Sequence, residues 1–425
     1  VKFIIKQGQK YFYIFVLKMK KIFQIEKRKK AKELYEKGWS IRKIAGYLVS
    51  SKNSVNKWIK LTDESIIQDL RGWEKGKLRQ HNSKEKERIC SLRLELEKEC
   101  SFFYGIKVVQ NNYEKLYGFM LPKSFIYNVL KENDLVKRRR KAEKGKSKYM
   151  KYPVHTLSKL GKRVMSIDFI GPKYLAGSSE RINFLSCKYI RPNKVGLVKR
   201  IEGQTTEDCI STLKEVWQTN PIPDVLKVDN DSAFGTNLTH KKCIGKFTLF
   251  LLNYGIIPLY VAPRSPWNNG DVEGFNSVFS KQFWNKLQFT DEQEIDVKLT
   301  SFNMEYEKYS LLTDNNPTNL TEIYLPDIKG VNPENKDVSK FKAHKIYFLR
   351  TVRRKGEKET EEEYGFIEVL KEEIKIRKDL INLFVVVCIN LKNKEIQISS
   401  ETESGDLIIE KTTKYEIKNI IYEKK

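Results

Sequence analysis

The sequence predicts a multidomain protein with an all-α N-terminal part, a central α/β domain and a small all-β C-terminal domain. The chain has 425 residues, too many for one compact core, so we expect two to four domains. Apolar residues follow helical spacing near the N-terminus, and strand-length and helix-length apolar patterns alternate over residues 160–325. From about residue 343 the apolar runs become short and charged turns separate them, which indicates a small β-barrel.

The composition indicates an anionic partner. The chain has 80 Lys and Arg against 54 Asp and Glu, a formal charge of +26. Such an excess favours nucleic acid before membrane, although a solvated surface in a lysine-rich proteome would give the same balance. The six cysteines contain no CxxC pair and there are four histidines, so neither a disulfide framework nor a Cys/His zinc site is indicated. We expect a reducing compartment, the cytoplasm, with the protein associated with the nucleoid.

The first residues differ in character from the rest of the chain. The chain begins with Val1, and its apolar run Tyr11–Leu17 is too short to cross a bilayer and lacks a small-residue cleavage site. Met19 opens a basic stretch that is typical of a protein start. We therefore expect residues 1–18 to be a non-native or disordered leader, and no other segment is a membrane candidate.

Residues 19–65 predict three short helices. The first, Glu26 to Lys37, ends at Gly38, and Ser40 can cap the second, Ile41 to Leu48. The third helix, 53–61, buries Val55, Trp58 and Ile59. Five polar side chains of this segment face outward, namely Lys52, Asn53, Asn56, Lys57 and Lys60. The arrangement resembles a helix-turn-helix whose last helix enters a DNA major groove; the alternative is a plain three-helix interaction module.

A second helical unit and a basic linker are expected next. Residues 82–136 contain two helical stretches, around Ile89–Leu96 and Ser124–Leu130, and are interpreted as a second helical or winged-helix DNA-binding unit. Residues 137–155 open with a basic run. Its candidate DNA-binding residues are Arg138, Arg139, Arg140 and Lys141. Such a run either lies along phosphates or is a solvated tether.

The central region, 156–325, predicts three strands followed by helix, strand, helix, strand and helix. The strands are Val164–Ile170, Ile182–Ile190, Lys194–Ile201, Asp224–Val228 and Ile256–Ala262; the helices are Thr206–Thr219, Phe247–Tyr254 and Asp271–Leu287. This order is that of the ribonuclease-H-like fold and also fits a generic α/β domain. Six short strands between residues 345 and 409 suggest that the barrel spans residues 340–420.

Three carboxylates in this region are candidate functional groups. Asp168 stands in the middle of a buried-type strand, where a charge is costly unless it is paired or bound to a cation. Asp229 follows a strand and Glu273 begins a helix. Taken singly, these two are better explained as a turn residue and as compensation of the helix dipole.

Together, the three phrases are specific. They read Ile167–Phe169 around the strand Asp, Asp229-Asn-Asp-Ser-Ala-Phe234, and Asn269-Gly-Asp-Val-Glu-Gly-Phe-Asn276. In this order they resemble the core of the retroviral-integrase superfamily of DDE transposases, of the bacterial and archaeal insertion-sequence type. The resemblance covers about residues 160–325.

There are three departures from the family pattern. Asp231 stands where the family has Gly, and Gly274 where it usually has Arg. Glu273 lies 44 residues after Asp229, a longer spacing than the family's, and the surplus falls in the loop-like stretch Gly235–Lys246. None of these departures removes a carboxylate.

The resemblance implies a ribonuclease-H-like integrase core in which Asp168, Asp229 and Glu273 are catalytic and bind two Mg²⁺ (or Mn²⁺) ions. It also implies double-stranded DNA as partner, both element ends and target, and a homo-oligomer on DNA. Two alternatives stay open: a domesticated DNA-binding protein without catalysis, and a ribonuclease-H-type nuclease that cuts without joining.

Overall fold

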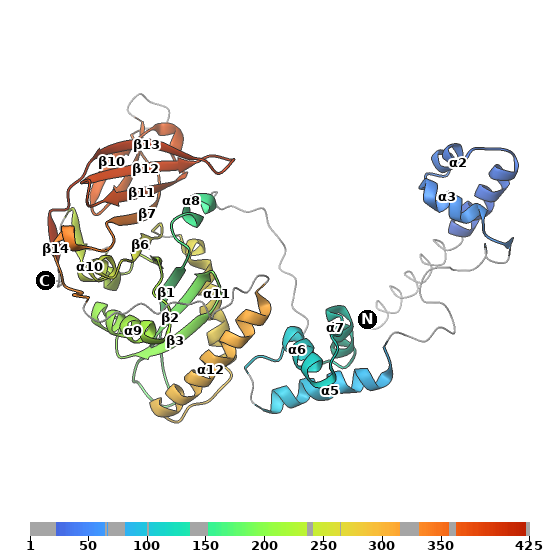
Figure 1. Cartoon of the computed structure of the whole chain (residues 1–425), viewed down its shortest axis with the longest axis horizontal. Coiled ribbons are helices and arrows are strands. Elements are labelled where there is room, and N and C mark those ends of the chain that lie inside the picture. Colours follow the sequence, from blue (N-terminus) through green and yellow to red (C-terminus); the bar gives the residue numbers. More distant parts are fainter. Residues whose placement is uncertain are drawn as a thin grey trace, which may run out of the picture. The chain divides into compact units, whose positions relative to one another are not determined.

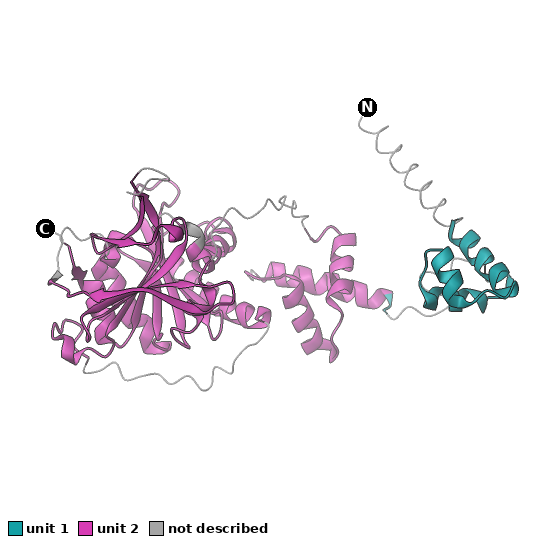
Figure 2. Ribbon diagram, turned by 90° about the horizontal axis from the view of Figure 1, so that it is seen from above, with its two compact units in different colours: residues 1–82 teal, residues 83–425 magenta. Residues whose placement is uncertain are grey.

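The structure is a computed structural model that describes residues 23–63, 66, 81–99, 102–136, 152–235, 241–263, 265–314, 331–356 and 363–421. The chain divides into two compact units, 1–82 and 83–425 (Figure 2). The expected leader and the basic residues Arg138, Arg139, Arg140 and Lys141 lie outside the described residues. No helix in the described part of the chain is long and apolar enough to cross a membrane.

The first unit contains the three expected helices. They span residues 23–36, α2 (Ile41–Tyr47) and α3 (Lys52–Ile59). The Ser40 hydroxyl accepts from the Lys43 N–H, as its predicted cap role requires. The Ser51 hydroxyl caps α3 in the same way, so this helix begins one residue earlier than expected. Val55 is fully buried against the other two helices.

Three further helices follow, α5 (Ser83–Lys98), α6 (Ile106–Tyr117) and α7 (Lys123–Glu132). Their apolar faces share a core that includes Ile89 and Tyr113. No strand occurs in the described residues of 81–136, so a purely helical unit describes this stretch better than a winged helix.

The second unit is built on a nine-stranded mixed sheet (Figure 1). Its first five strands are β1 (Val164–Lys173), β2 (Ile182–Arg191), β3 (Gly196–Ile201), β4 (Val225–Val228) and β6 (Ile257–Tyr260). β1, β2 and β3 are antiparallel, whereas β4 is parallel to β1 and β6 is parallel to β4. These five strands occur in the predicted order along the chain, and β1 and β4 lie side by side within the sheet.

Helices cover both faces of these strands. On one face lie α9 (Thr206–Thr219) and α10 (Lys246–Asn253), which share a core with Leu185 and Cys187 of β2. On the other lie α11 (Gly270–Phe279) and α12 (Glu292–Thr313), whose core includes Phe184, the residue before Leu185. Because side chains alternate along a strand, these assignments put the two helix pairs on opposite faces.

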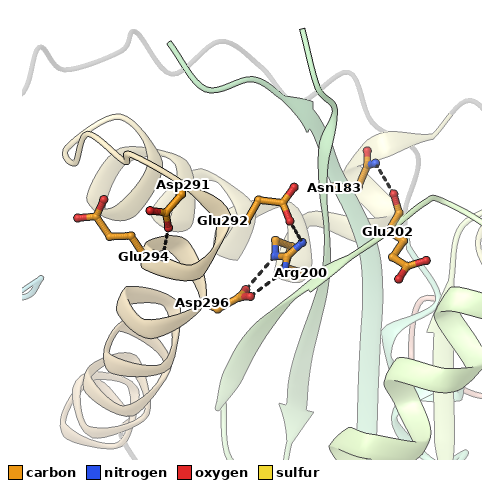
Figure 3. Close-up of polar contacts among 7 residues, drawn as sticks. All are labelled: Asn183, Arg200, Glu202, Asp291, Glu292, Glu294 and Asp296. Atoms are coloured by element: carbon orange, nitrogen blue, oxygen red, sulfur yellow. Dashed lines mark hydrogen bonds and ion pairs between the residues drawn. The ribbon is translucent and has the colours of Figure 1, made fainter. Parts of the chain in front are cut away.

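The helix α12, which the sequence interpretation did not include, is held to the edge strand by ion pairs. Arg200 of β3 donates to Asp296 and Glu292 at distances of 2.6–2.9 Å (Figure 3). Asp291 caps the helix by accepting from the Glu294 N–H. These contacts fix the N-terminal turn of α12.

The separate C-terminal β-barrel that we predicted is not confirmed, because several of its strands join the central sheet. β7 (Lys345–Thr351) pairs in parallel with β6, and β11 (Phe384–Asn390), β12 (Glu395–Glu401) and β13 (Leu407–Lys414) extend the same sheet. β8 (Arg353–Lys355), β9 (Tyr364–Val369) and β10 (Glu372–Ile376) form a three-stranded sheet. The short β5 (Cys243–Gly245) pairs with β14 (Asn419–Ile421). Buried residues of these strands, such as Ile367 and Val385, belong to the same hydrophobic core as the central sheet.

Candidate functional site

The three candidate carboxylates line one pocket. Asp168 comes from β1, Asp229 from the residue after β4, and Glu273 from the first turn of α11. All three face a cavity of about 820 Å³. Segments more than 100 residues apart in the chain are therefore brought to one place, as the sequence motifs required.

Strand register explains the convergence. Ser166 of β1 lies directly beside Lys227 of β4 in the parallel pair. Asp168 and Asp229 each follow two residues later, and residues two apart point to the same face. The same face is covered by α11, which carries Glu273. The sequence folds this way because the other face of both strands is apolar and packs on α9 and α10.

Asp168 is held by a neighbour on α11. The carboxamide nitrogen of Asn276 donates to its carboxylate at 2.8 Å. Burial, together with the neighbouring Asp229 and Glu273 carboxylates, raises the pKa of Asp168 to about 7, against the smaller opposing effect of this bond. Burial is the largest cause of this raised pKa, and the neighbouring Asp229 carboxylate is the next.

Asp229 begins a tight turn. Its carboxylate accepts from the Asp231 N–H at 3.0 Å, and burial raises its pKa above the ordinary value. The Asp231 carboxylate in turn accepts from the Ala233 N–H at 2.8 Å and caps a short 3₁₀ helix. The φ angle of Asp231 is −62°, so this position does not require the glycine that the family has there.

Glu273 is the least restrained of the three carboxylates. It is exposed and makes no hydrogen bond or ion pair with any described residue. The loop before it is fixed, because the buried Ser166 hydroxyl donates to the Asn269 carboxamide at 2.8 Å. The backbone that carries Glu273 is thus anchored to β1, while its carboxylate can turn toward the other two.

The sequence interpretation missed an arginine of this pocket. Arg350 of β7 is buried, and its guanidinium donates to the Val261, Leu349 and Glu368 carbonyls and, at 3.4 Å, to the Asn230 carboxamide. Burial lowers its pKa to about 10. No sequence signal pointed to it, since the strand that carries it was assigned to a separate barrel.

The donor atoms of the pocket suit a hard cation. Carboxylate oxygens are the ligands that Mg²⁺ prefers, and Asp168, Asp229 and Glu273 supply only these. As the side chains stand, no three His, Cys, Asp or Glu residues of the described ranges lie close enough together to hold a metal ion. Rotation of the unpartnered Glu273 side chain is the simplest way to bring the three together.

The candidate DNA-reading residues share one helix. Lys52, Asn53, Asn56 and Lys57 of α3 and the following Lys60 are all exposed, as predicted. Their outward direction follows from Val55, which turns the opposite side of the helix into the core.

Comparison with known proteins gives partial matches. A family model described as "Putative ATPase subunit of terminase (gpP-like)" matches residues 26–73, within the first unit. No curated protein matches the chain.

Solved structures similar to the chain are integrases and a transposase. The simian T-cell lymphotropic virus intasome, in complex with the PP2A regulatory subunit B56 gamma, is 14% identical over 68% of this chain and 96% of that one, with a TM-score of 0.34. The catalytic core of BIV integrase is 13% identical over 33% and 80%, with a TM-score of 0.24. The mariner Mos1 paired end complex with Mg is 10% identical over 68% and 93%, with a TM-score of 0.18. At these values the similarities carry no argument, and the function must be inferred from the residues of the pocket.

Proposed function

We propose that the chain is a DDE-type transposase/integrase with a ribonuclease-H-like core, which cleaves the ends of a mobile DNA element and joins them to target DNA. The observation that carries the proposal is the convergence of Asp168, Asp229 and Glu273 on one pocket. Three carboxylates that repel one another are costly for folding. A cation that binds among the three carboxylates would offset this cost.

In this proposal Asp168, Asp229 and Glu273 hold two Mg²⁺ or Mn²⁺ ions. Such ions activate an oxygen nucleophile and stabilise the leaving oxygen of a phosphodiester. Asp168, fixed by Asn276 on a central strand, is the rigid member of the set. Asp229 is held by the turn that follows it, and Glu273 completes the site from α11. The Asp231 carboxylate, engaged in its turn, is assigned no ligand role.

DNA recognition is assigned to the first unit and the basic linker. The exposed α3 residues Asn53, Asn56 and Lys57 have the amide and ammonium groups that read base edges. The linker residues Arg138–Lys141 would add phosphate contacts that do not depend on sequence. The enzyme would act as a homo-oligomer on double-stranded DNA.

A strand-transfer assay tests the proposal against both alternatives. The substrate is a duplex that carries an inverted repeat, to be sought in the DNA on both sides of the reading frame, with Mg²⁺ and a supercoiled target plasmid. The proposed enzyme nicks the repeat and joins its 3′ end to the plasmid. Cleavage without joining would favour a ribonuclease-H-type nuclease, and specific binding without either reaction would favour a domesticated DNA-binding protein.

A further inference from the structure

A second pocket lies next to the carboxylate pocket, and residues 268–273, which lead into the first turn of α11, line both. The second pocket has a volume of about 550 Å³ and is lined by Asn268, Gly270 and Asp271, whereas Asn269 and Glu273 line the carboxylate pocket. One short segment of the chain therefore contributes side chains to two neighbouring cavities. The proposed chemistry uses the first cavity and leaves the second without a role.

The second pocket contains a buried lysine without an acceptor. Lys227 of β4 is 6% exposed, and its ammonium group makes no hydrogen bond or ion pair with any described residue. Its ammonium group lies 5.9 Å from the centroid of the Tyr152 ring. The ammonium group is not fully shielded from the pocket and lies within the electrostatic influence of Asp271 and Glu273. It can therefore donate hydrogen bonds to a ligand in the pocket.

A buried amide provides the second, independent observation. Asn268 is 3% exposed, and neither its carboxamide nitrogen nor its carboxamide oxygen has a hydrogen-bond partner. The group therefore presents one donor and one acceptor, side by side and unsatisfied. Buried polar groups of native proteins are nearly always paired, and two orphan atoms on one side chain indicate a missing partner that has both a donor and an acceptor.

The other residues that line the pocket indicate which class of ligand can bind there. Val164, Ile190 and Leu259 make much of the lining apolar. The Arg191 guanidinium at the rim donates to the Ser158 and Leu157 carbonyls. A phosphate group would meet apolar walls and the Asp271 carboxylate, and it would leave the Asn268 oxygen without a donor. A nucleobase has apolar faces and an edge that carries both donors and acceptors.

The second pocket lies close enough to the carboxylates to hold a nucleotide next to the reacting phosphate. Lys227 lies two residues before Asp229 on the same strand face, a separation of roughly 6.6 Å along the strand. Lys227 also pairs in register with Ser166, whose hydroxyl holds Asn269 of the segment shared by the two pockets. A DNA strand whose phosphate is bound in the first pocket would thus pass over the second.

We propose that this second pocket binds a single unstacked nucleobase of the DNA substrate, with Asn268 pairing with the base edge, Lys227 donating to a further base acceptor and the Tyr152 ring beside the base. The inference rests on the proposed function for the identity of the substrate. Such a pocket would hold the strand in place beside the carboxylates. It would also make the reaction depend on a base that the helix-turn-helix does not read.

The test compares two ligands under conditions in which no cleavage takes place. The full chain is titrated, in EDTA, with a short fluorescein-labelled single-stranded DNA of mixed sequence and with the same strand in which every base is replaced by an abasic unit. The wild-type chain should bind the base-containing strand roughly tenfold more tightly. In Lys227→Met and in Asn268→Leu this ratio should fall toward one while affinity for the abasic strand stays unchanged.

The matched control is Lys159→Met, which neutralises an exposed lysine outside the pocket and should keep the wild-type ratio. Both pocket variants replace a buried polar group by an apolar one, so their melting temperatures should not fall. A wild-type ratio of one, or variants that keep the wild-type ratio, would overturn the proposal, and the wild-type measurement is decisive even if a variant fails to fold. If Lys227→Met weakened both strands equally, the ligand would be a phosphate. The absence of Mg²⁺-dependent cleavage by a wild-type chain that keeps its base preference would count against the proposed function alone.

Discussion

The Asn276 carboxamide donates a hydrogen bond of 2.8 Å to the Asp168 carboxylate and thereby ties α11 to the central strand β1. A bond to the charged form of an acid lowers its pKa. This contact therefore opposes the burial and the neighbouring charges that raise the pKa of Asp168. The first prediction rests on this balance.

Replacing Asn276 by Leu should shift the pH dependence of cleavage. Without the bond, the pKa of Asp168 rises further above 7, so a smaller fraction of the enzyme is charged and able to bind metal at neutral pH. We expect a loss at pH 7 that is smaller than tenfold, because this bond is the weakest of the influences on the pKa of Asp168, and recovery at pH 9. Rates measured across pH check this.

The matched control is Asn303→Leu. Asn303 makes two comparable hydrogen bonds, of 2.8 and 2.9 Å, to the backbone of Val198 on β3. Its loss should lower stability without moving the pH profile. An unshifted profile in Asn276→Leu would show that the bond does not set the charge of Asp168.

The second prediction concerns stability in the absence of metal. The pKa of Asp168 is raised to about 7 from an ordinary value of 3.8. The stability that this group contributes is therefore fully present below pH 3.8 and is lost as the pH rises through 7. Asp168→Asn should accordingly melt at a higher temperature than the wild type at pH 8, and the gap should shrink as the pH falls toward 4.

Thermal melts in EDTA and in Mg²⁺ show whether the charge of Asp168 causes the lower stability of the wild type. Added Mg²⁺ should raise the melting temperature of the wild type at pH 8 and leave that of Asp168→Asn nearly unchanged. A gap that is the same at all pH values would mean that the charge of Asp168 is not the source of the instability.

Much of the central sheet could be predicted from local patterns. The expected strands around Asp168 and before Asp229 are present, because each is a short apolar run bounded by turn residues. The join between Leu259 of β6 and Tyr347 of β7 could not be predicted. It depends on a pairing between segments 88 residues apart, and the short charged strands that follow fit a barrel equally well.

Only part of the site could be predicted, because some of its residues are brought in by pairing between distant segments. The three carboxylates lie in phrases whose order is informative, and they do line one pocket. Arg350 reaches that pocket only through the unpredicted join. Asn268 of the second pocket could not be predicted from the sequence, because the lack of a hydrogen-bond partner for a buried atom depends on packing.

Asp231→Gly should be tolerated, which is the third prediction. The change removes the carboxylate that caps the following 3₁₀ helix at Ala233 and should cost roughly a few tenths of a kcal/mol of stability, because glycine is itself tolerated at a helix N-cap. Cleavage should fall by less than tenfold because no ligand is lost. Turnover at a saturating Mg²⁺ concentration is the measurement, and a collapse to the level of Asp229→Asn would assign a ligand role to Asp231.

The fourth prediction concerns recognition. Asn56 is exposed on α3, and its amide can pair with an adenine edge. Asn56→Ala should reduce the preference for element ends over random DNA by roughly tenfold, since one bidentate base contact contributes about 1–3 kcal/mol. Competition binding with both DNAs measures the preference. If binding stays equally specific, recognition belongs to residues 84–136.

The central claim is that Asp168, Asp229 and Glu273 act together as metal ligands in DNA cleavage and joining. The most direct measurement compares Mg²⁺-dependent cleavage of an element-end duplex by the wild type, Asp168→Asn, Asp229→Asn and Glu273→Gln, with end binding measured in parallel. Each variant keeps the shape of the side chain and removes its charge. We predict that all three lose cleavage and strand transfer while binding the end nearly as well as the wild type, whereas near-normal turnover by any one of them would contradict the claim.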